Sequence, residues 1–254
     1  MVLLLDIGNT CIKFSSYDLK KNKIGNPISY FTYNKKTLFK IVKYVKIRKI
    51  KYVLASSVVP KVYNSFKKNL SKEKIKVYEY KDKKINKFIK INVKNKKQVG
   101  SDRIVNAFGS LNYYKENCII IDFGTATTFD IADKNNIYQG GIIAPGVKLS
   151  LQTLNRFTAK LPLVKLSIQK KVIGKDTQSA INSGLFIGYS CLINGIIDKI
   201  LKETKKKYLI ILTGGYSKIF KNKIDHKCII NKDITLYGLA LSVKKNKKVF
   251  SEKK

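Results

Sequence analysis

Two short segments of the chain place an aspartate, a glycine and a threonine directly after an apolar stretch. The first spans residues 2–10, VLLLDIGNT, and the second spans residues 118–125, CIIIDFGT. A carboxylate can hold a cation, a glycine lets backbone N–H groups approach oxygen atoms closely, and a threonine hydroxyl can donate a hydrogen bond. These residue types at this spacing suit a site that binds phosphate together with a metal ion.

Each segment continues into a second apolar or β-branched stretch, CIKF at 11–14 and ATTFD at 126–130. The order strand, Asp-x-Gly, Thr, strand therefore occurs twice, which indicates an internal repeat with one acidic hairpin in each half. A single Asp-x-Gly turn usually means only a hairpin. Two matched hairpins, together with Gly214-Gly215 after the strand expected at 208–212, are much more specific evidence for a phosphate site.

Other phosphate and metal motifs are missing from the sequence. The pattern GxxxxGK[ST] fails around Gly174-Lys175, because Gln169 and Asp176 stand at its other fixed positions, and no GxGxxG occurs. His226 is the only histidine and the four cysteines are widely spaced, which excludes a histidine-based zinc site or catalytic triad. Cys11 and Cys118 lie in apolar stretches and are expected to be small core residues.

The composition is that of a basic globular protein. The 254 residues are 44% hydrophobic, with 52 Lys and Arg against 16 Asp and Glu, a formal net charge of +36. Such a charge is compatible with nucleic acid or anionic lipid, but the lysines are spread along the chain, which favours a solvated surface. Asp6 interrupts the N-terminal apolar stretch, and no uninterrupted apolar run approaches membrane-spanning length. A cytoplasmic protein that does not bind membranes is expected.

Hydrophobic periodicity predicts a mixed sheet with helices in each half. Besides the two hairpins, strands are expected at 28–33, 52–55, 75–80, 137–143 and 208–212. Helices are expected at 35–46, 61–70, 98–114, 147–157, 177–201 and 234–244. The lysine-rich segment 81–97 is expected to be an irregular connection. The boundary between the two halves of the chain is predicted near residue 98.

The sequence motifs together resemble the actin-like ATPases and, within that superfamily, the type III pantothenate kinases, which begin coenzyme A synthesis. The resemblance rests on DIGNTCIKF at 6–14, VGSDR at 99–103, DFGTATTFD at 122–130, GGIIAPG at 140–146, LPLV at 161–164, GKDTQSAINSG at 174–184 and TGG at 213–215. It implies an α/β fold of two actin-like (ribonuclease H-like) domains, 1–97 and 98–254. Each would be a mixed sheet flanked by helices, with the active site in the cleft between them.

The resemblance also implies a role for each matching residue. ATP would be bound by Asp6, Ile7, Gly8, Asn9, Thr10, Cys11, Ile12, Lys13 and Thr125. Asp6 would hold Mg²⁺, and Asp122 would hold a monovalent cation, K⁺ or NH₄⁺. Pantothenate would be bound by Gly100, Ser101, Asp102, Arg103 and Thr177, with Asp102 as the general base. Members of this family are dimers, and the glycine-bearing helix around 180–195 is the candidate interface.

Simpler interpretations remain open for several of these residues. Asp102 suits a helix N-cap, Thr177 suits a helix N-terminus, and Lys13 suits a solvated strand position. Residues 93–97, VKNKK, lack the Tyr and Pro found there in many relatives, which puts substrate contacts from that segment in doubt.

Two other functions compete with pantothenate phosphorylation. One is an actin-like kinase for a different small alcohol. The other is a nucleic-acid-binding accessory protein, which the presence of Asp6, Asp102 and Asp122 disfavours.

Overall fold

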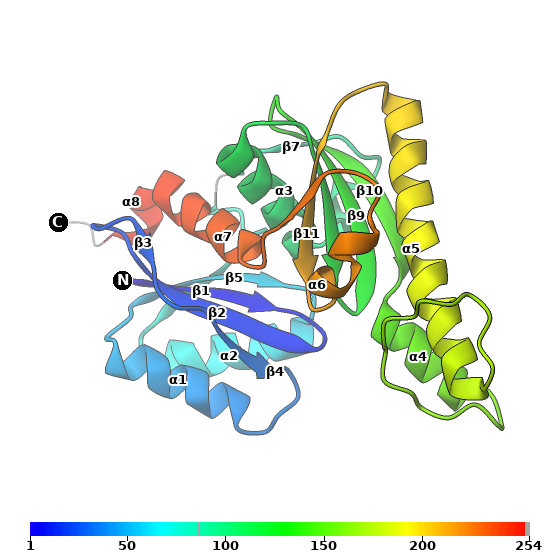
Figure 1. The fold of residues 1–254 in the computed structure, drawn as a ribbon. Coiled ribbons are helices and arrows are strands. Elements are labelled where there is room, and N and C mark those ends of the chain that lie inside the picture. Colours follow the sequence, from blue (N-terminus) through cyan, green and yellow to red (C-terminus); the bar gives the residue numbers. More distant parts are fainter. Residues whose placement is uncertain (86, 252–254) are drawn as a thin grey trace. The chain divides into compact units, whose positions relative to one another are not determined.

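The computed structural model describes residues 1–85 and 87–251 (Figure 1). The chain forms two compact units, each assembled from more than one segment. The first unit comprises Met1–Lys115, Ala132–Gly140 and Asp233–Lys254, and the second comprises Glu116–Ile131 and Gly141–Lys232. The boundary predicted near residue 98 divides the chain only once. The compact units differ from it because the chain enters the second unit after Lys115 and returns to the first twice.

The first unit contains a sheet in the order β3-β2-β1-β5-β6, with β4 also paired to β2. Its strands are β1 (Val2–Ile7), β2 (Cys11–Asp18), β3 (Lys23–Ile24), β4 (Ile28–Phe31), β5 (Tyr52–Ser57) and β6 (Lys76–Glu79). β1 is antiparallel to β2 and parallel to β5. Helices α1 (Thr37–Ile47) and α2 (Pro60–Lys72) bury Ile41, Val45, Phe66 and Leu70 in the core of this sheet.

Two further helices of the first unit pack against each other at paired glycines. They are α3 (Ser101–Tyr114) and α7 (Ile234–Lys245), and α7 also contacts β1. A methyl group on Gly109 would lie 2.8 Å from the Ile234 carbonyl oxygen, and one on Gly238 would lie 2.4 Å from that of Val105. Only glycine fits at these two positions, so the backbones approach closely. The short helix α8 (Lys247–Phe250) follows.

The second sheet has the order β12-β11-β8-β9-β10-β7. Its strands are β7 (Lys90–Ile91), β8 (Cys118–Phe123), β9 (Ala126–Asp133), β10 (Ile137–Pro145), β11 (Leu209–Gly214) and β12 (Cys228–Ile230). In the second unit this sheet packs with α4 (Val147–Arg156), α5 (Thr177–Thr204) and α6 (Ser217–Phe220). The ring of Phe220 stacks on those of Phe123 and Phe186, with centroids 5.3 and 5.7 Å away.

The two sheets repeat one strand order, which confirms the internal repeat. β4-β2-β1-β5-β6 in the first sheet corresponds to β10-β9-β8-β11-β12 in the second. β1 and β8 are six residues long, share one burial pattern and carry an aspartate at the fifth position. Asp6 is level with Ser56 on β5, and Asp122 is level with Thr213 on β11. Both acidic hairpins therefore start at the same place in their sheets.

Short elements account for most differences from the sequence-based expectations. Within the segment 81–97, β7 pairs with β10 and a 3-10 turn begins at Lys96; residue 86 of that segment lies outside the described residues. α6, α8, β12 and the 3-10 turn Lys221–Lys223 were not expected. Elements of two to four residues are too short to show a hydrophobic period. α3 begins at Ser101 because Gly100 is its N-cap.

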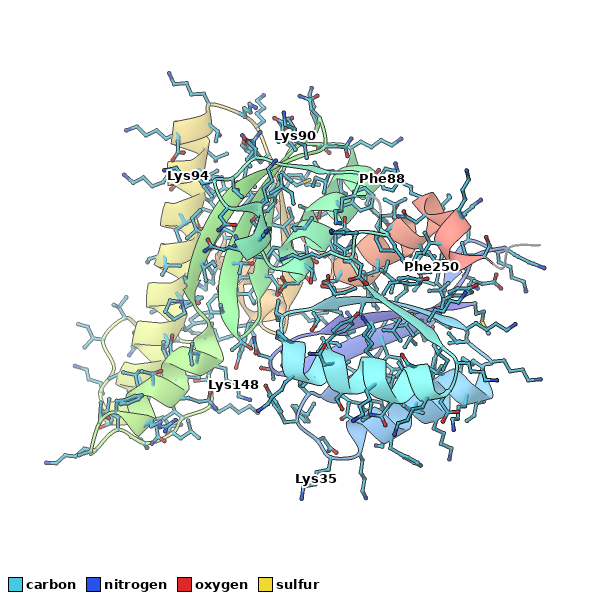
Figure 2. All side chains as sticks on the ribbon, turned by 180° about the vertical axis from the view of Figure 1, so that it is seen from behind. Lys35, Phe88, Lys90, Lys94, Lys148 and Phe250 are labelled. Atoms are coloured by element: carbon cyan, nitrogen blue, oxygen red, sulfur yellow. The ribbon has the colours of Figure 1, made fainter. Side chains whose placement is uncertain are left out.

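One described helix, α5, is long and apolar enough to cross a membrane by length and composition. Its side chains Phe186, Ile193 and Ile197 are at most 1% exposed and belong to the core of the second unit. Such burial is what a core helix shows. Lysine side chains point outward from helices and loops, as at Lys35, Lys94 and Lys148 (Figure 2).

Candidate functional site

The first acidic hairpin joins β1 to β2 through an exposed turn. The Gly8 amide donates a hydrogen bond to the Cys11 carbonyl at 3.0 Å, which closes the turn. Asn9, Thr10 and Cys11 are exposed, and Asp6 is half-buried at its base. Cys11 is therefore not the core residue expected, because its side chain alternates outward along β2.

Two residues assigned to ATP, Ile7 and Ile12, have completely buried side chains. Only their backbone groups are available to a ligand. The hairpin thus offers backbone amides, short polar side chains and one carboxylate, with an apolar base that holds the strands in place.

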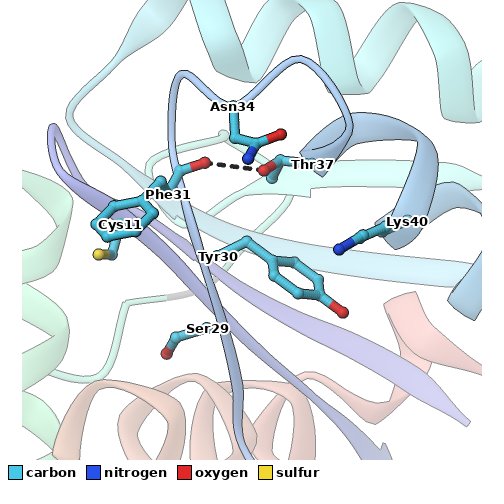
Figure 3. Close-up of a pocket in the computed structure, with 7 residues that line it drawn as sticks. All are labelled: Cys11, Ser29, Tyr30, Phe31, Asn34, Thr37 and Lys40. Carbon is cyan, nitrogen blue, oxygen red and sulfur yellow. Dashed lines mark hydrogen bonds between the residues drawn. The ribbon is translucent and has the colours of Figure 1, made fainter.

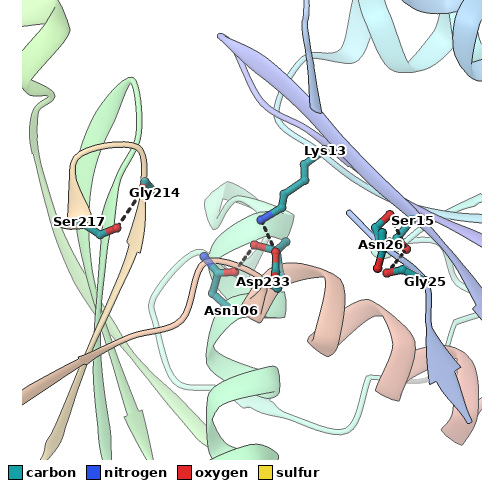
Figure 4. Close-up of polar contacts among 9 residues, drawn as sticks. Lys13, Ser15, Gly25, Asn26, Asn106, Gly214, Ser217 and Asp233 are labelled. Atoms are coloured by element: carbon teal, nitrogen blue, oxygen red, sulfur yellow. Dashed lines mark hydrogen bonds and ion pairs between the residues drawn. The ribbon is translucent and has the colours of Figure 1, made fainter. Parts of the chain in front are cut away.

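Lys13 lies directly across from Asp6 on β2 and forms an ion pair with Asp233. The Nζ–Oδ1 distance is 2.6 Å, and the lysine side chain is 23% exposed (Figure 4). The interpretation of Lys13 as a solvated strand residue is therefore wrong. Asp233 precedes α7, where the Thr235 hydroxyl donates to the Asn106 side chain at 2.7 Å. Asp233 was not among the predicted site residues, because a contact so distant in sequence leaves no local pattern.

The segment expected to bind the phosphate acceptor starts α3 against the end of β5. The Ser101 hydroxyl accepts from the Ser57 amide at 2.9 Å and donates to the Ser57 carbonyl at 3.1 Å. Ser101 is only 1% exposed. Since Asp6 is level with Ser56 on the neighbouring strand, the acceptor segment and the Asp6 hairpin meet at the same end of β5.

Asp102 lies inside the first turn of α3, and its carboxylate accepts a hydrogen bond from the Arg103 amide at 2.8 Å. The N-cap is Gly100, so the interpretation of Asp102 as the N-cap is wrong. Burial raises the pKa of Asp102, opposed by that amide and by the Arg103 charge. A carboxyl group with a raised pKa is better matched to accepting a proton near neutral pH. A methyl group on Gly100 would lie 2.3 Å from this carboxylate.

A second carboxyl with a raised pKa belongs to Glu79, a half-buried residue at the end of β6 whose side chain interacts with the Ser101 hydroxyl. Its Oε1 atom is buried without a hydrogen-bond partner, and the Lys81 amide donates to Oε2. Burial raises the pKa of Glu79, opposed by the Ser101 hydroxyl and the Lys81 amide. The lysine-rich sequence around Glu79 gave no sign of a buried acid.

The second acidic hairpin joins β8 to β9, with Asp122 half-buried and Thr125 exposed. The end of β11 folds closely onto it. Gly214 has φ +82°, and a methyl group there would lie 2.6 Å from Asp122 Oδ1. The Ser217 hydroxyl fixes this turn by donating to the Gly214 carbonyl at 2.9 Å (Figure 4). The same methyl group on Gly214 would also lie 2.6 Å from the Phe123 carbonyl oxygen. Carboxylate and carbonyl oxygens are the donors that a hard cation takes.

Thr177 is the first residue of α5 and is exposed. The helix is capped by Asp176, which accepts from the Ser179 amide at 2.8 Å within a capping box. That hydrogen bond lowers the pKa of Asp176. The helix-start interpretation of Thr177 agrees with this geometry, and its hydroxyl is open to solvent.

Metal binding in the described part of the chain does not rest on clustered side chains. Among residues 1–85 and 87–251, no three His, Cys, Asp or Glu side chains gather as a metal-binding group. Mg²⁺ in nucleotide enzymes is typically held by one or two carboxylates together with substrate phosphates. The single carboxylate of Asp6 fits that pattern.

The sequence of this chain matches known proteins along most of its length. A family model described as type III pantothenate kinase matches residues 2–199. A type III pantothenate kinase of Pelagibacter ubique is 46% identical over 94% of this chain and 97% of its own length. A type III pantothenate kinase of Persephonella marina is 36% identical over 94% of this chain and 96% of its own length.

Solved structures share the fold at low sequence identity. A Campylobacter jejuni protein assigned to the Baf family of transcriptional activators has a TM-score of 0.63 at 22% identity, covering 97% of this chain and 99% of its own. A polyphosphate/ATP-glucomannokinase of Arthrobacter has a TM-score of 0.50 at 16% identity, covering 95% and 97%. These likenesses concern the fold, and the predicted class of two actin-like α/β domains is confirmed. Both sequence relatives match at more than 30% identity over nearly the whole chain, so the chain belongs to the type III pantothenate kinase family.

Proposed function

We propose that this protein transfers the γ-phosphoryl group of ATP to the primary hydroxyl of pantothenate, with Asp102 as the general base. The observation that carries the proposal is the position of Asp102. Asp102 lies in the first turn of α3, at the same end of β5 as the Asp6 hairpin, and burial raises the pKa of its carboxyl. Membership of the family supplies the substrate.

In this reaction the pantothenate hydroxyl oxygen forms a bond to the γ-phosphorus, and the bond from that phosphorus to the bridging oxygen breaks. The hydroxyl proton passes to the Asp102 carboxylate, and ADP leaves. Such a transfer depends mainly on positioning and on neutralising phosphate charge. Arg103 offers a fork of donors that suits either the pantothenate carboxylate or the moving phosphoryl group.

The Asp6 hairpin is the proposed site for the phosphates of ATP. Backbone amides in an exposed turn bind anionic oxygens well, and Asn9 and Thr10 are the exposed residues of this turn. Lys13 contributes positive charge beside it, held by Asp233. Asp6 would hold Mg²⁺, which when bound neutralises phosphate charge.

The Asp122 hairpin is the proposed site for a monovalent cation, K⁺ or NH₄⁺, and Thr125 is a proposed phosphate contact. Support comes from the Asp122 carboxylate and the Phe123 carbonyl oxygen, each 2.6 Å from the place that a methyl group on Gly214 would take. Thr177 is a proposed pantothenate contact, because its side chain is exposed at the start of α5. Ser101 and Gly100 are proposed to contribute backbone groups, since the Ser101 hydroxyl is engaged with Ser57.

The protein is further proposed to be a cytoplasmic homodimer that does not bind nucleic acid. The outward face of α5 carries Gly184, Gly188, Cys191 and Gly195, all exposed. Within the described residues, a methyl group on any of these glycines would meet no atom within 4 Å. A second copy of the helix could approach this face closely.

The test is ADP release from ATP and Mg²⁺, with and without pantothenate, in K⁺ and then in Na⁺ buffer. We expect turnover that depends on pantothenate and falls in Na⁺. Asp102→Asn should lower kcat by about 10²-fold or more, the usual contribution of general-base catalysis. Asp198→Asn, a change of an exposed acid on α5, should leave kcat unchanged.

Three results would count against particular parts of the proposal. Wild-type turnover by a folded Asp102→Asn variant removes the general base. Turnover that is equal in K⁺ and Na⁺ removes the role of Asp122. Turnover with other small alcohols but none with pantothenate replaces the substrate.

A further inference from the structure

The residue that follows the fourth strand of the first sheet, β4, is hydrogen-bonded directly to the Asp6 hairpin. This residue is Thr32, next after β4, and it is 6% exposed. Its hydroxyl donates to the Gly8 carbonyl at 2.6 Å, and its amide donates to the Thr10 carbonyl at 2.9 Å. One residue thus engages carbonyls on both sides of Asn9.

We propose that Thr32 is a positioning residue that fixes the Asp6 hairpin in the conformation that binds nucleotide phosphate. The inference rests on the proposed function of that hairpin. No part of Thr32 needs to touch ATP, because it acts through the two carbonyls that it holds.

The tip of the hairpin is exposed, and the direction of its carbonyl groups matters for phosphate binding. Asn9 and Thr10 are exposed, and the Gly8 amide is already directed to the Cys11 carbonyl. A carbonyl oxygen that turned toward a bound phosphate would repel it, whereas amides that face the ligand attract it. By accepting from Thr32, the Gly8 and Thr10 carbonyls are held toward the protein.

The second half of the chain contains the corresponding backbone hydrogen bond. Gly146 follows β10, the strand that corresponds to β4, and its amide donates to the Thr125 carbonyl at 3.1 Å. A methyl group on Gly146 would lie 2.1 Å from that carbonyl oxygen and 2.7 Å from that of Gly124. Gly146 thus occupies the place in the second half that the brace, Thr32, takes in the first. Its backbone lies so close to the hairpin that a side chain has no room there.

Each brace is itself held by a side chain from a helix. In the first half, the Thr37 hydroxyl at the start of α1 donates to the Phe31 carbonyl at 2.8 Å (Figure 3). In the second half, the Tyr189 hydroxyl of α5 donates to the Pro145 carbonyl. The carbonyl immediately before each brace is therefore anchored to a helix. The Phe31 contact lies in a surface cavity of about 360 Å³ that is lined also by Cys11, Tyr30 and Lys40.

The direct test is Thr32→Val, which keeps the shape and removes the hydroxyl, compared with Thr32→Ser, which keeps the hydroxyl. The probe is Mg-ATP alone, titrated calorimetrically without acceptor, followed by steady-state kinetics. We expect Thr32→Val to raise the Kd for Mg-ATP and the KM for ATP about tenfold, because the Gly8 carbonyl loses its buried donor. The KM for pantothenate should change less than twofold, and Thr32→Ser should stay within about threefold of wild type.

Ser15→Ala is the control, since it removes a buried hydroxyl of the same sheet that donates to the Gly25 carbonyl at 2.7 Å, away from the Gly8 and Thr10 carbonyls. It should lower the unfolding temperature while leaving the Kd for Mg-ATP within threefold. A folded Thr32→Val variant whose Kd is within twofold of wild type would overturn the proposal. An equal loss of ATP affinity in Thr32→Val and Ser15→Ala would also overturn it, because the effect would then be general.

Hydrogen exchange of the wild type tests the brace without any variant. We expect exchange in residues 28–33 to slow on Mg-ATP binding, because the brace and the hairpin are ordered together. Unchanged exchange there contradicts the proposal. ATP binding without pantothenate turnover would reject the substrate proposed above and leave the brace standing, whereas no ATP binding by the wild type would reject both.

Discussion

At the scale of single residues, the environment of Asp102 has a consequence for pH dependence. Burial raises the pKa of this carboxyl above its ordinary value. A general base acts when it is deprotonated, so kcat/KM for pantothenate should fall as pH decreases through the raised pKa. The pKa fitted to the acid limb of the profile is therefore expected to lie above that of an ordinary aspartate, about 3.9.

A kcat/KM profile measured between pH 4 and 9 checks this expectation. The fitted pKa of the acid limb should be lost in Asp102→Asn and retained in Asp198→Asn. A profile that stays flat down to the range of an ordinary carboxyl group would contradict it.

Glu79 permits a prediction about stability. Its pKa is raised in the folded protein, so folding binds protons, and stability is lost as pH rises through that pKa. Glu79→Gln removes the buried charge and should raise the unfolding temperature at pH 8. An increase of about 1 kcal/mol in the free energy of unfolding corresponds to an increase of about 2–4 °C in the unfolding temperature of a chain of this size. The difference should shrink toward pH 4, where the glutamate is neutral.

Thermal unfolding at both pH values measures this difference. Glu203→Gln, a change of an exposed acid on α5, serves as the control and should shift neither midpoint. If Glu79→Gln were less stable than wild type at pH 8, the Glu79 carboxylate would be contributing a favourable contact and the prediction would fail.

At the scale of elements, the turn after β11 determines the shape of the second hairpin. Gly214 adopts a left-handed backbone and leaves no room for a methyl group beside Asp122, whereas a methyl group on Gly215 would meet no atom of the described residues within 4 Å. Gly214→Ala should therefore destabilise the protein by about 1–3 kcal/mol and raise the K⁺ concentration needed for activity. Gly215→Ala is the matched control and should do neither.

Chemical denaturation and K⁺ titration of activity separate the two effects. A Gly214→Ala variant that is less stable but has unchanged K⁺ activation would mean that the turn supports the fold alone. Equal behaviour of the two alanine variants would mean that the close approach to Asp122 has no consequence.

The elements that the sequence predicted best are those with a long hydrophobic period or a repeated motif. The two hairpins and the helices α1, α3 and α5 were expected at nearly their observed places, because eight or more residues carry the pattern. The short strands β7 and β12 were not expected, since two or three residues carry none. At the candidate site, the motifs indicated Asp6, Asp102 and Asp122. Glu79, Asp233 and Thr32 became visible only when distant segments were brought together.

At the scale of the whole molecule, the outward face of α5 leads to a prediction about assembly. If Gly184, Gly188 and Gly195 let a second helix approach, then a large charged side chain there should prevent association. Gly188→Glu is expected to elute as a monomer when the wild type elutes as a dimer, with molar mass measured by light scattering. Lys61→Glu, an exposed change on α2, should keep the wild-type mass.

A dimeric Gly188→Glu variant would place the interface elsewhere, and a monomeric wild type would remove the proposed dimer. Ultracentrifugation at several concentrations distinguishes a weak dimer from a monomer. Because Gly188 is exposed and a Cβ added there would meet no atom of the described residues within 4 Å, the substitution should not disturb folding.

The whole-molecule organisation was only partly visible in the sequence. Repeated motifs indicated two halves with the same topology, and both sheets have the same strand order. The composition of the compact units was not visible. It depends on β9, β10 and α7, through which the chain changes unit, and no composition shift or flexible linker marks those points.

The return of α7 to the first unit bears on how the protein is made. On the ribosome, Met1–Lys115 emerges first, yet the unit to which it belongs lacks α7 until residues 234–245 have been synthesised. The second unit ends at Lys232 and can bury its core earlier. The part of the molecule that is translated first is thus completed last. A premature stop codon before Ile234 would leave the second unit whole and the first without the helix that packs at Gly109 and Gly238.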